Sequence, residues 1–263
     1  MNDNKMTAYA YSPEPVLIDT RFDMKLAKPY MVTPKVFNDA RGSFSEVLVK
    51  GKCFSYMDEV KQINRSTSKP GVLRGFHAQT GDWCQAKLVE AVNAKLYDII
   101  VDMRPTSSTF RKSASYVLDP VKQNKLFVPK GFLHAFFVPY DIEVDEAIFM
   151  YYCDNVYNKP SEIGADPKSV LPEVLTDPDN AELKACIEAD NLSLSDKDTA
   201  GEDFNALAER MKNDPKMSMW WMPESFQLDK RVRNDGYDYP ETSDDAFKSI
   251  MASVGIDVKK ADE

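Results

Sequence analysis

The sequence predicts an all-β fold, a sandwich or barrel of short strands, followed by a helical C-terminal extension. Two observations lead to this prediction. From about residue 30 to residue 157, runs rich in β-branched and aromatic residues alternate with turn signals, and no helical period interrupts them. Beyond residue 200, apolar residues recur at helical spacing instead. Hydrophobic residues make up 43% of the 263-residue chain, which is enough for a sizeable core.

The predicted strands are short and are separated by turns that contain Gly or Pro. They are Ser43–Val49, Ala86–Ala91, Lys95–Asp102, Ala114–Leu118, Lys125–Val128, Ala135–Val138 and Ala147–Tyr152. In the third of these strands the side chains alternate, so that Asp98 and Asp102 share a face. We interpret both as buried carboxylates that pair with Arg104 or Arg74.

Three segments make up the predicted domain organisation. They are an N-terminal arm over residues 1–30, which reads as irregular, a barrel over residues 31–200, and a helical extension over residues 201–263. Residues 158–198 carry several Pro and Asp and read as loops with one short helix near Ala181–Ala189. The extension packs on the barrel or on a partner subunit.

Two better helices are predicted in the extension, each with apolar residues at i, i+3, i+4 and i+7. The apolar positions are Phe204, Leu207, Ala208 and Met211 in the first helix, and Phe247, Ile250, Met251 and Val254 in the second. Ser243 precedes the second helix as an N-cap and Gly255 follows it. The aromatic and Met-rich segment MSMWWMPESF lies between the two helices and is interpreted as packing surface.

Composition argues against several classes of protein. The formal net charge is -9, from 33 basic and 42 acidic side chains, which disfavours a nucleic-acid or anionic-membrane partner. The N-terminus has no apolar stretch of signal-peptide length, and the longest apolar run, Ala147–Cys153, is too short to span a membrane. The four cysteines lie far apart without a CxxC pair and are interpreted as reduced thiols. A soluble cytoplasmic protein is expected.

The stretch Val72–Gln79 carries the strongest functional signal. It contains Arg74, His77 and Gln79, with Lys87 ten residues after the histidine. On a strand His77 and Gln79 share a face, whereas Arg74 has the opposite parity unless Gly75 marks a bulge. A base, a phosphate clamp and a second cation would then meet at one pocket.

The only other histidine is His134. Because the chain has no H-x-H pair, and no third nitrogen or sulfur ligand lies nearby in sequence, no metal site is predicted.

The order of several motifs resembles the dTDP-4-dehydrorhamnose 3,5-epimerase family, a branch of the cupin superfamily. The resemblance runs from about Pro34 to Asp198. The matching pieces are PKVFNDARGSFSE, QINRSTSKPGVLRGFHAQ, AKLV, YDIIVDMR, SSTF, VPKGFLHAF, FMY with the later Tyr157 and Glu162, and LSDKD. The resemblance implies a cupin-type jelly-roll β-barrel that forms a homodimer, and a nucleotide-diphosphate-linked 4-keto-6-deoxy sugar as substrate.

The resemblance also implies a mechanism without metal or cofactor. His77, held by Asp198, would remove a proton from the carbon at C3 or C5 beside the C4 ketone. Tyr151 would donate a proton on the other face, with Tyr152 as its rival for this role. Lys87 would stabilise the enolate oxygen.

Further positions match the family's substrate contacts. Arg74 would clamp phosphate, His134 would position the sugar, and Tyr157 would lie near the channel. The residues implied for the nucleotide are Arg41, Glu46, Gln62 and Asn64, and the first two lie on a strand that crosses to the partner subunit in the family.

Departures from the family pattern keep alternatives open. The family's usual glycines are Ala94, Ala135 and Arg111 here, and the stretch from His134 to Tyr151 is longer than usual. The nucleotide could therefore be dTDP, GDP or CDP, and one or both carbons could be epimerised. The alternative functions are a related keto-sugar isomerase and a non-catalytic nucleotide-sugar-binding protein.

Overall fold

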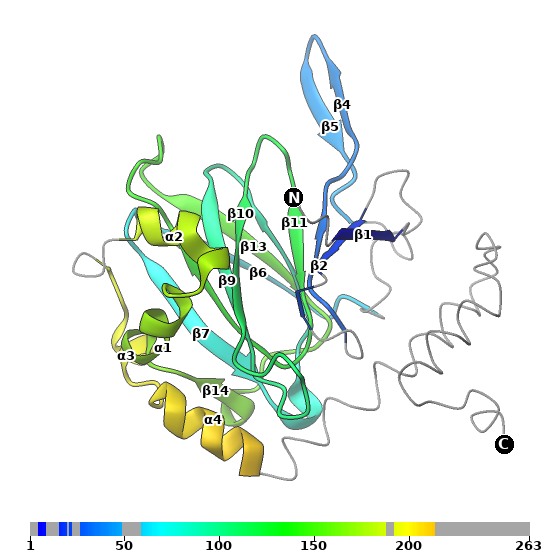
Figure 1. Ribbon diagram of the computed structural model, residues 1–263. Helices are drawn as coiled ribbons and strands as arrows, with labels where there is room; N and C mark the ends of the chain where they lie inside the picture. The colour runs from blue at the N-terminus through cyan, green and yellow to red at the C-terminus, as the bar shows by residue number, and fades with distance from the viewer. Residues whose placement is uncertain are drawn as a thin grey trace, which may run out of the picture. The chain divides into compact units, whose positions relative to one another are not determined.

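The computed structural model describes residues 5–8, 16–19, 21–22, 27–48, 59–187 and 192–213, and all of them belong to one compact unit, residues 1–225. Two antiparallel sheets make up most of this unit (Figure 1). The all-β prediction is therefore confirmed. The helix predicted around residues 247–254 and the segment MSMWWMPESF lie outside the described residues. None of the described helices is long and apolar enough to cross a bilayer.

The first sheet has seven strands. Their order is β1 (Lys5–Ala8), β2 (Val16–Asp19), β3 (Tyr30–Val32), β11 (Lys125–Val128), β8 (Lys87–Ala91), β13 (Ala147–Cys153) and β6 (Gln62–Ser68). Its first two strands come from the segment predicted as an irregular arm. Strands of four residues are too short to show a period in the sequence. They join the sheet through pairing, β1 with β2 and β2 with β3.

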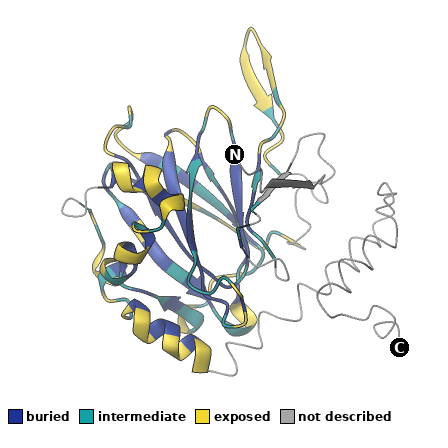
Figure 2. Cartoon of the chain, in the orientation of Figure 1, coloured by how far each residue is buried: buried dark blue, intermediate teal, exposed yellow. Residues whose placement is uncertain are grey.

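The second sheet has five strands. Their order is β10 (Ser113–Leu118), β9 (Leu96–Asp102), β12 (Phe132–Phe137), β7 (Leu73–Gln79) and β14 (Glu162–Gly164). A separate hairpin is formed by β4 (Val36–Asp39) and β5 (Gly42–Ser45), and most of its residues are exposed (Figure 2). The predicted strands over residues 86–152 all appear, with ends shifted by a few residues, whereas the strand predicted over Ser43–Val49 ends at Ser45.

Side-chain parity explains why β9 is buried along its whole length. Leu96 and Ile100 belong to the apolar core shared with the seven-stranded sheet. Tyr97, Ile99 and Val101 belong to a second core, on the opposite face, that includes residues of the helices. The five-stranded sheet is thus covered on both faces, which accounts for its almost continuously apolar strands.

Four α-helices in the described part of the chain pack on the five-stranded sheet. They are α1 (Pro167–Val174), α2 (Ala181–Cys186), α3 (Asp196–Thr199) and α4 (Phe204–Asn213). Helices α1, α3 and α4 lie near β7 and β14, and α2 lies near β9 and β10 (Figure 1). The prediction of α4 is confirmed, because all four of its periodic apolar residues are buried. Helix α1 was not predicted, because its two prolines are typical of a loop. Pro167 lies in the first turn of α1, where a backbone N–H would have no partner within the helix. The Asp166 side chain caps the helix by accepting a hydrogen bond from the Lys168 amide.

The bulge that the sequence left open at Gly75 is present. Between β12 and β7 the register pairs His134 with His77 but Phe136 with Arg74, so β7 has one extra residue. The extra residue brings Arg74 and His77 to the same face. Gly75 has φ +130°, and a Cβ there would lie 2.4 Å from the Ala135 Cβ and 2.6 Å from the His134 carbonyl oxygen. No L side chain fits this position without backbone displacement.

Gly75→Ala is therefore expected to destabilise the protein. The control is Gly42→Ala, because Gly42 has a similar φ of +135° but nothing within 4 Å of its hypothetical Cβ. The overpacking at Gly75 should cost about 1–3 kcal/mol more than the control substitution. Urea unfolding of the two variants measures the difference, and equal midpoints would contradict the geometry.

Candidate active site

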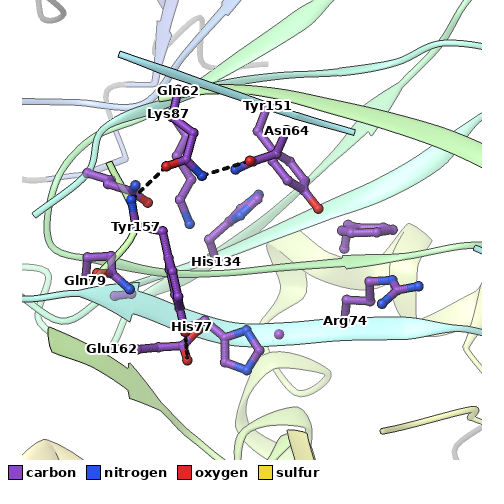
Figure 3. Close-up of a pocket in the computed structure, with 14 residues that line it drawn as sticks. Gln62, Asn64, Arg74, His77, Gln79, Lys87, His134, Tyr151, Tyr157 and Glu162 are labelled. Carbon is purple, nitrogen blue, oxygen red and sulfur yellow. Dashed lines mark hydrogen bonds between the residues drawn. The ribbon is translucent and has the colours of Figure 1, made fainter. Parts of the chain in front are cut away.

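A pocket with about 320 Å³ of free space opens between the two sheets. Most of the predicted site residues line it: Gln62, Asn64, Arg74, His77, Lys87, His134, Tyr151 and Tyr157 (Figure 3). The strands β6, β8 and β13 supply side chains from one sheet, and β7 and β12 supply them from the other. The structure thus brings together residues that are far apart in the chain, such as Gln62 and Tyr157, which are 95 positions apart.

His77 is hydrogen-bonded to Asp198, with 3.0 Å between Nε2 and Oδ1. The second oxygen of Asp198 accepts a hydrogen bond from the Ser195 hydroxyl at 2.6 Å. Burial alone would raise the pKa of Asp198, but the hydrogen bonds from His77 and Ser195 outweigh it and lower this pKa below its ordinary value. The carboxylate therefore stays ionised and holds a proton on Nε2, which leaves Nδ1 as the nitrogen that can accept one.

Two bridges hold the segment that carries Asp198. Ser193 pairs in parallel with Val72 at the start of β7, and Glu202 pairs in parallel with Ala165 beyond β14. Between them Ser195 caps α3 by accepting from the Asp198 amide. The segment is thus tied on one side of Asp198 to the start of β7, the strand that carries His77, and on the other side to the end of β14, its neighbour in the sheet.

Tyr151 and Lys87 reach the pocket from the neighbouring strands β13 and β8 (Figure 3). Burial raises the pKa of the Tyr151 phenol, against the opposing effect of the Arg74 guanidinium, so the phenol stays protonated at neutral pH. Tyr152 points to the other face, where its hydroxyl donates to Glu90 at 2.6 Å. Of the two rival tyrosines, Tyr151 is the one that lines the pocket.

Lys87 is partly buried among the pocket side chains. Burial lowers the pKa of its ammonium group, although the nearby Cys153 and Asp98 oppose the shift. In the described part of the chain its Nζ makes no hydrogen bond or ion pair. The Lys87 cation is therefore available to an oxygen of a bound ligand.

His134 is paired with Asp98, with 2.7 Å between Nε2 and Oδ2. Asp98 is fully buried, and its Oδ1 has no hydrogen-bond partner among the described residues. Burial raises the pKa of this carboxyl despite the opposing effect of His134. The expected pairing of Asp98 with an arginine is wrong. Arg104 instead binds Asp102, as the sequence also allowed, with two contacts of 2.7 Å. The two carboxylates are four positions apart on an extended strand, so one arginine cannot reach both.

Arg74 stands at the exposed edge of the pocket. Its Nε donates to the Ser68 hydroxyl at 2.8 Å and its Nη2 to the Thr67 carbonyl at 3.1 Å. These contacts orient the guanidinium and leave other N–H groups for a ligand.

A chain of hydrogen bonds orders the opposite end of the pocket. The Tyr157 amide donates to Gln62 at 2.7 Å, and the Gln62 amide donates to Asn64 at 2.8 Å. The two side-chain amides are therefore fixed relative to each other and to the Tyr157 loop.

The structure does not bring Arg41 and Glu46 to this pocket. Arg41 lies at the tip of the β4–β5 hairpin, is 90% exposed, and pairs with Asp39 at 2.6 Å. Glu46 follows the end of β5. Their contribution to a partner's pocket, implied by the family resemblance, stays a prediction.

Glu162 also lines the pocket, although the sequence predicted no role for it. Its Oε1 pairs with Lys197 at 2.8 Å, and its Oε2 accepts from the Tyr157 hydroxyl at 3.0 Å. Gln79 also lines the pocket, and its side chain accepts from the Asn158 amide. The three-residue strand β14 that positions Glu162 is too short to be seen as a period in the sequence.

Among the side chains that the structure describes, no cluster of three or more His, Cys, Asp or Glu could hold a metal ion. The two histidines of the pocket are instead paired with carboxylates, His77 with Asp198 and His134 with Asp98. The groups that meet here are those of proton transfer: a carboxylate-held imidazole, a protonated phenol and a lysine cation.

Comparisons with known proteins agree with this geometry. The family model described as dTDP-4-dehydrorhamnose 3,5-epimerase matches residues 23–206. The enzyme of that name from Shigella flexneri is 36% identical over 174 residues, which cover 65% of this chain and 88% of the relative. The crystal structure of the Elizabethkingia anophelis enzyme has 34% identity and a TM-score of 0.58, covering 69% of this chain and 93% of the other.

A dTDP-6-deoxy-D-glucose-3,5-epimerase from Legionella pneumophila, crystallised with dTDP-4-keto-L-rhamnose, has 29% identity and a TM-score of 0.57. The similarity covers 67% of this chain and 88% of that one. These likenesses confirm the predicted jelly-roll architecture.

Proposed function

Because the chain belongs to the dTDP-4-dehydrorhamnose 3,5-epimerase family, we propose that it inverts the carbons on either side of the ketone in a dTDP-linked 4-keto-6-deoxy sugar. One observation carries the proposal beyond family membership. His77, paired with Asp198, and Tyr151 face one pocket from two different sheets. A base and an acid on different sides of a bound sugar are what inversion at a carbon requires.

The proposed reaction proceeds through an enolate. His77 accepts the proton from a carbon beside the ketone, and the electron pair of the broken C–H bond moves onto the ketone oxygen. The imidazolium that forms is stabilised by Asp198. Lys87 faces the developing oxyanion with its ammonium group. Tyr151 then gives its proton to the opposite face of the carbon, the ketone re-forms, and proton exchange with water restores both side chains.

The remaining pocket residues are proposed to bind and orient the substrate. Arg74, at the exposed edge, suits a diphosphate oxygen because its guanidinium is already oriented by Ser68. His134 would position the sugar, and Tyr157 with the Gln62–Asn64 pair would contact the nucleotide end. Arg41 and Glu46 would complete the pocket of a partner subunit in a homodimer. The cytoplasmic location expected from the sequence stays a prediction.

Solvent exchange tests the proposal directly. The purified protein is incubated in D2O with dTDP-, GDP- and CDP-linked 4-keto-6-deoxy sugars, and deuterium uptake is followed by NMR and mass spectrometry. Uptake at both carbons beside the ketone of the dTDP sugar is expected. Uptake at a single carbon would restrict the activity to one centre. No uptake from any of the three would refute an epimerase.

Tyr151→Phe is expected to separate exchange from inversion. The variant keeps His77, so it should still exchange the substrate's proton with solvent, at a rate within about tenfold of the wild type. Without the phenolic proton, inversion should fall by about 100-fold or more. The matched control is Tyr152→Phe, which should keep both activities because the Tyr152 hydroxyl binds Glu90 outside the pocket. Loss of both reactions in Tyr151→Phe would contradict the assignment of the acid.

A further inference from the structure

A second carboxylate, Glu162, faces the imidazole of His77. Strand β14 pairs with β7 so that Gly164 lies opposite His77 and Glu162 opposite Gln79. Residues two apart share a face of a strand, so the Glu162 side chain lies on the same side as His77. The ring is also close to β14, because a Cβ at Gly164 would lie 3.0 Å from the His77 Cδ2. His77 therefore has an acidic neighbour in addition to Asp198.

Glu162 does not face the imidazole as a free anion. Lys197 binds its Oε1 at 2.8 Å and the Tyr157 hydroxyl binds its Oε2 at 3.0 Å (Figure 3 shows the tyrosine contact). Burial alone would raise the pKa of Glu162, but Lys197 and His77 outweigh it and lower this pKa below its ordinary value. Glu162 is therefore ionised at neutral pH, and its charge is balanced by the neighbouring ammonium group.

Consecutive residues of α3 supply both contacts. Asp198 reaches His77, and Lys197 reaches Glu162. The bridges at Ser193 and Glu202 tie this segment to β7 and to the residue after β14. One short segment thus sets the charge on both sides of the imidazole.

The charge of Glu162 beside His77 explains the role of the contact between Lys197 and Glu162. Two unpaired carboxylates beside one imidazole would stabilise the imidazolium, and a protonated imidazole cannot accept the substrate's proton. When Lys197 balances the charge of Glu162, one net negative charge, that of Asp198, remains beside the imidazole. We propose that Lys197 is a positioning residue that pairs with Glu162, holds it, and so lets Asp198 alone govern the state of the His77 base. This inference rests on the proposed function only for its catalytic consequence.

Several charged or titratable groups face the region around His77. They are Asp198 and Lys197 from α3, Glu162 from β14, Tyr157 from the preceding loop, Arg74 from β7, Lys87 from β8, and the His134–Asp98 pair from β12 and β9. Variants at Lys197 and Glu162 leave all the other groups in this list unchanged. A difference in the titration of His77 between these variants therefore measures the effect of the Lys197–Glu162 ion pair.

A double-mutant cycle tests the proposal without requiring activity. The variants are Lys197→Met, Glu162→Gln and the combination of the two. The readout is NMR titration of the His77 ring, which is simple because the chain has two histidines and a His134→Gln variant assigns the signals. The control, Arg210→Met, breaks a surface pair with Glu202 of 2.6 Å that does not line the pocket.

Lys197→Met should move the His77 titration midpoint up by about 0.5–1 on the pH scale, because the unpaired Glu162 then stabilises the imidazolium. Glu162→Gln should move it down, the double variant should return near the wild type, and Arg210→Met should not move it. The acid limb of kcat/KM should follow the same order. A Lys197→Met midpoint equal to the wild type would overturn the proposal. So would a rise in KM alone, which would identify Lys197 as a phosphate contact.

The two proposals can fail separately. If the midpoints move as expected but the wild type shows no solvent exchange, the ion pair stands and the epimerase function fails. If exchange is present and the midpoints do not move, the function stands and the role of Lys197 fails.

Discussion

Replacing His77 with asparagine is expected to lower kcat by about 10³–10⁴-fold and to abolish deuterium exchange at both carbons beside the ketone. Asparagine is shorter than histidine, and its amide corresponds in position to Nδ1 and not to the Nε2 that contacts Asp198, so the variant loses this contact but adds no bulk to the pocket. It has no basic nitrogen, so the first proton transfer has no acceptor. Exchange in D2O and epimerisation, measured on the same dTDP sugar, report both losses.

The matched control for this variant is His134→Asn, which changes the chain's other histidine. His134 is paired with Asp98 in the same pocket, but the proposed mechanism gives it no proton to remove. This control should therefore weaken binding or turnover while exchange remains detectable. If His77→Asn exchanged deuterium within tenfold of the wild type, and His134→Asn did not, the base would have to be reassigned to His134.

Lys87→Met should have the second largest effect, a fall in kcat of about 10²–10³-fold. Methionine keeps the length and the apolar stem of the side chain but removes the cation that faces the developing oxyanion. A surface lysine serves as the control: Lys95→Met removes an exposed ammonium group that pairs with Asp119, and it should leave kcat unchanged. An effect of less than tenfold for Lys87→Met would exclude it as the main stabiliser of the enolate.

The pH dependence of the wild type should carry the signature of Lys87. Because burial lowers the pKa of Lys87, its cation is present below that lowered value and is lost as the pH rises through it, before the ordinary lysine value of 10.5 is reached. The pKa of Tyr151 is raised, so its phenol is still protonated there. In Lys87→Arg, the alkaline limb of kcat should therefore move to higher pH. In Tyr151→Phe, the alkaline limb of the solvent-exchange rate should stay at the same pH as in the wild type.

Much of the fold followed from local patterns. The alternation along β9 predicted which side chains share a face, and the helical spacing of Phe204, Leu207, Ala208 and Met211 predicted α4. Local patterns failed where an element was very short or contained proline. Strands β1, β2 and β14, and helix α1 with Pro172 inside it, are stabilised by pairing or packing against remote residues. Such contacts leave no period in the sequence.

For the pocket, the sequence alone determined which chemical groups were available and which of them share a strand face. Gly75 left open a bulge that would turn Arg74 toward His77, and the family motifs indicated Lys87 and Tyr151. Only the tertiary structure decided their partners. It placed Asp98 beside His134 instead of an arginine, chose Tyr151 over Tyr152 for the pocket, and brought Lys197 to Glu162. The physical reason is that the parity of a strand is a local property of the backbone, whereas the neighbour of a side chain depends on which distant segments the sheets and α3 bring within a few ångströms.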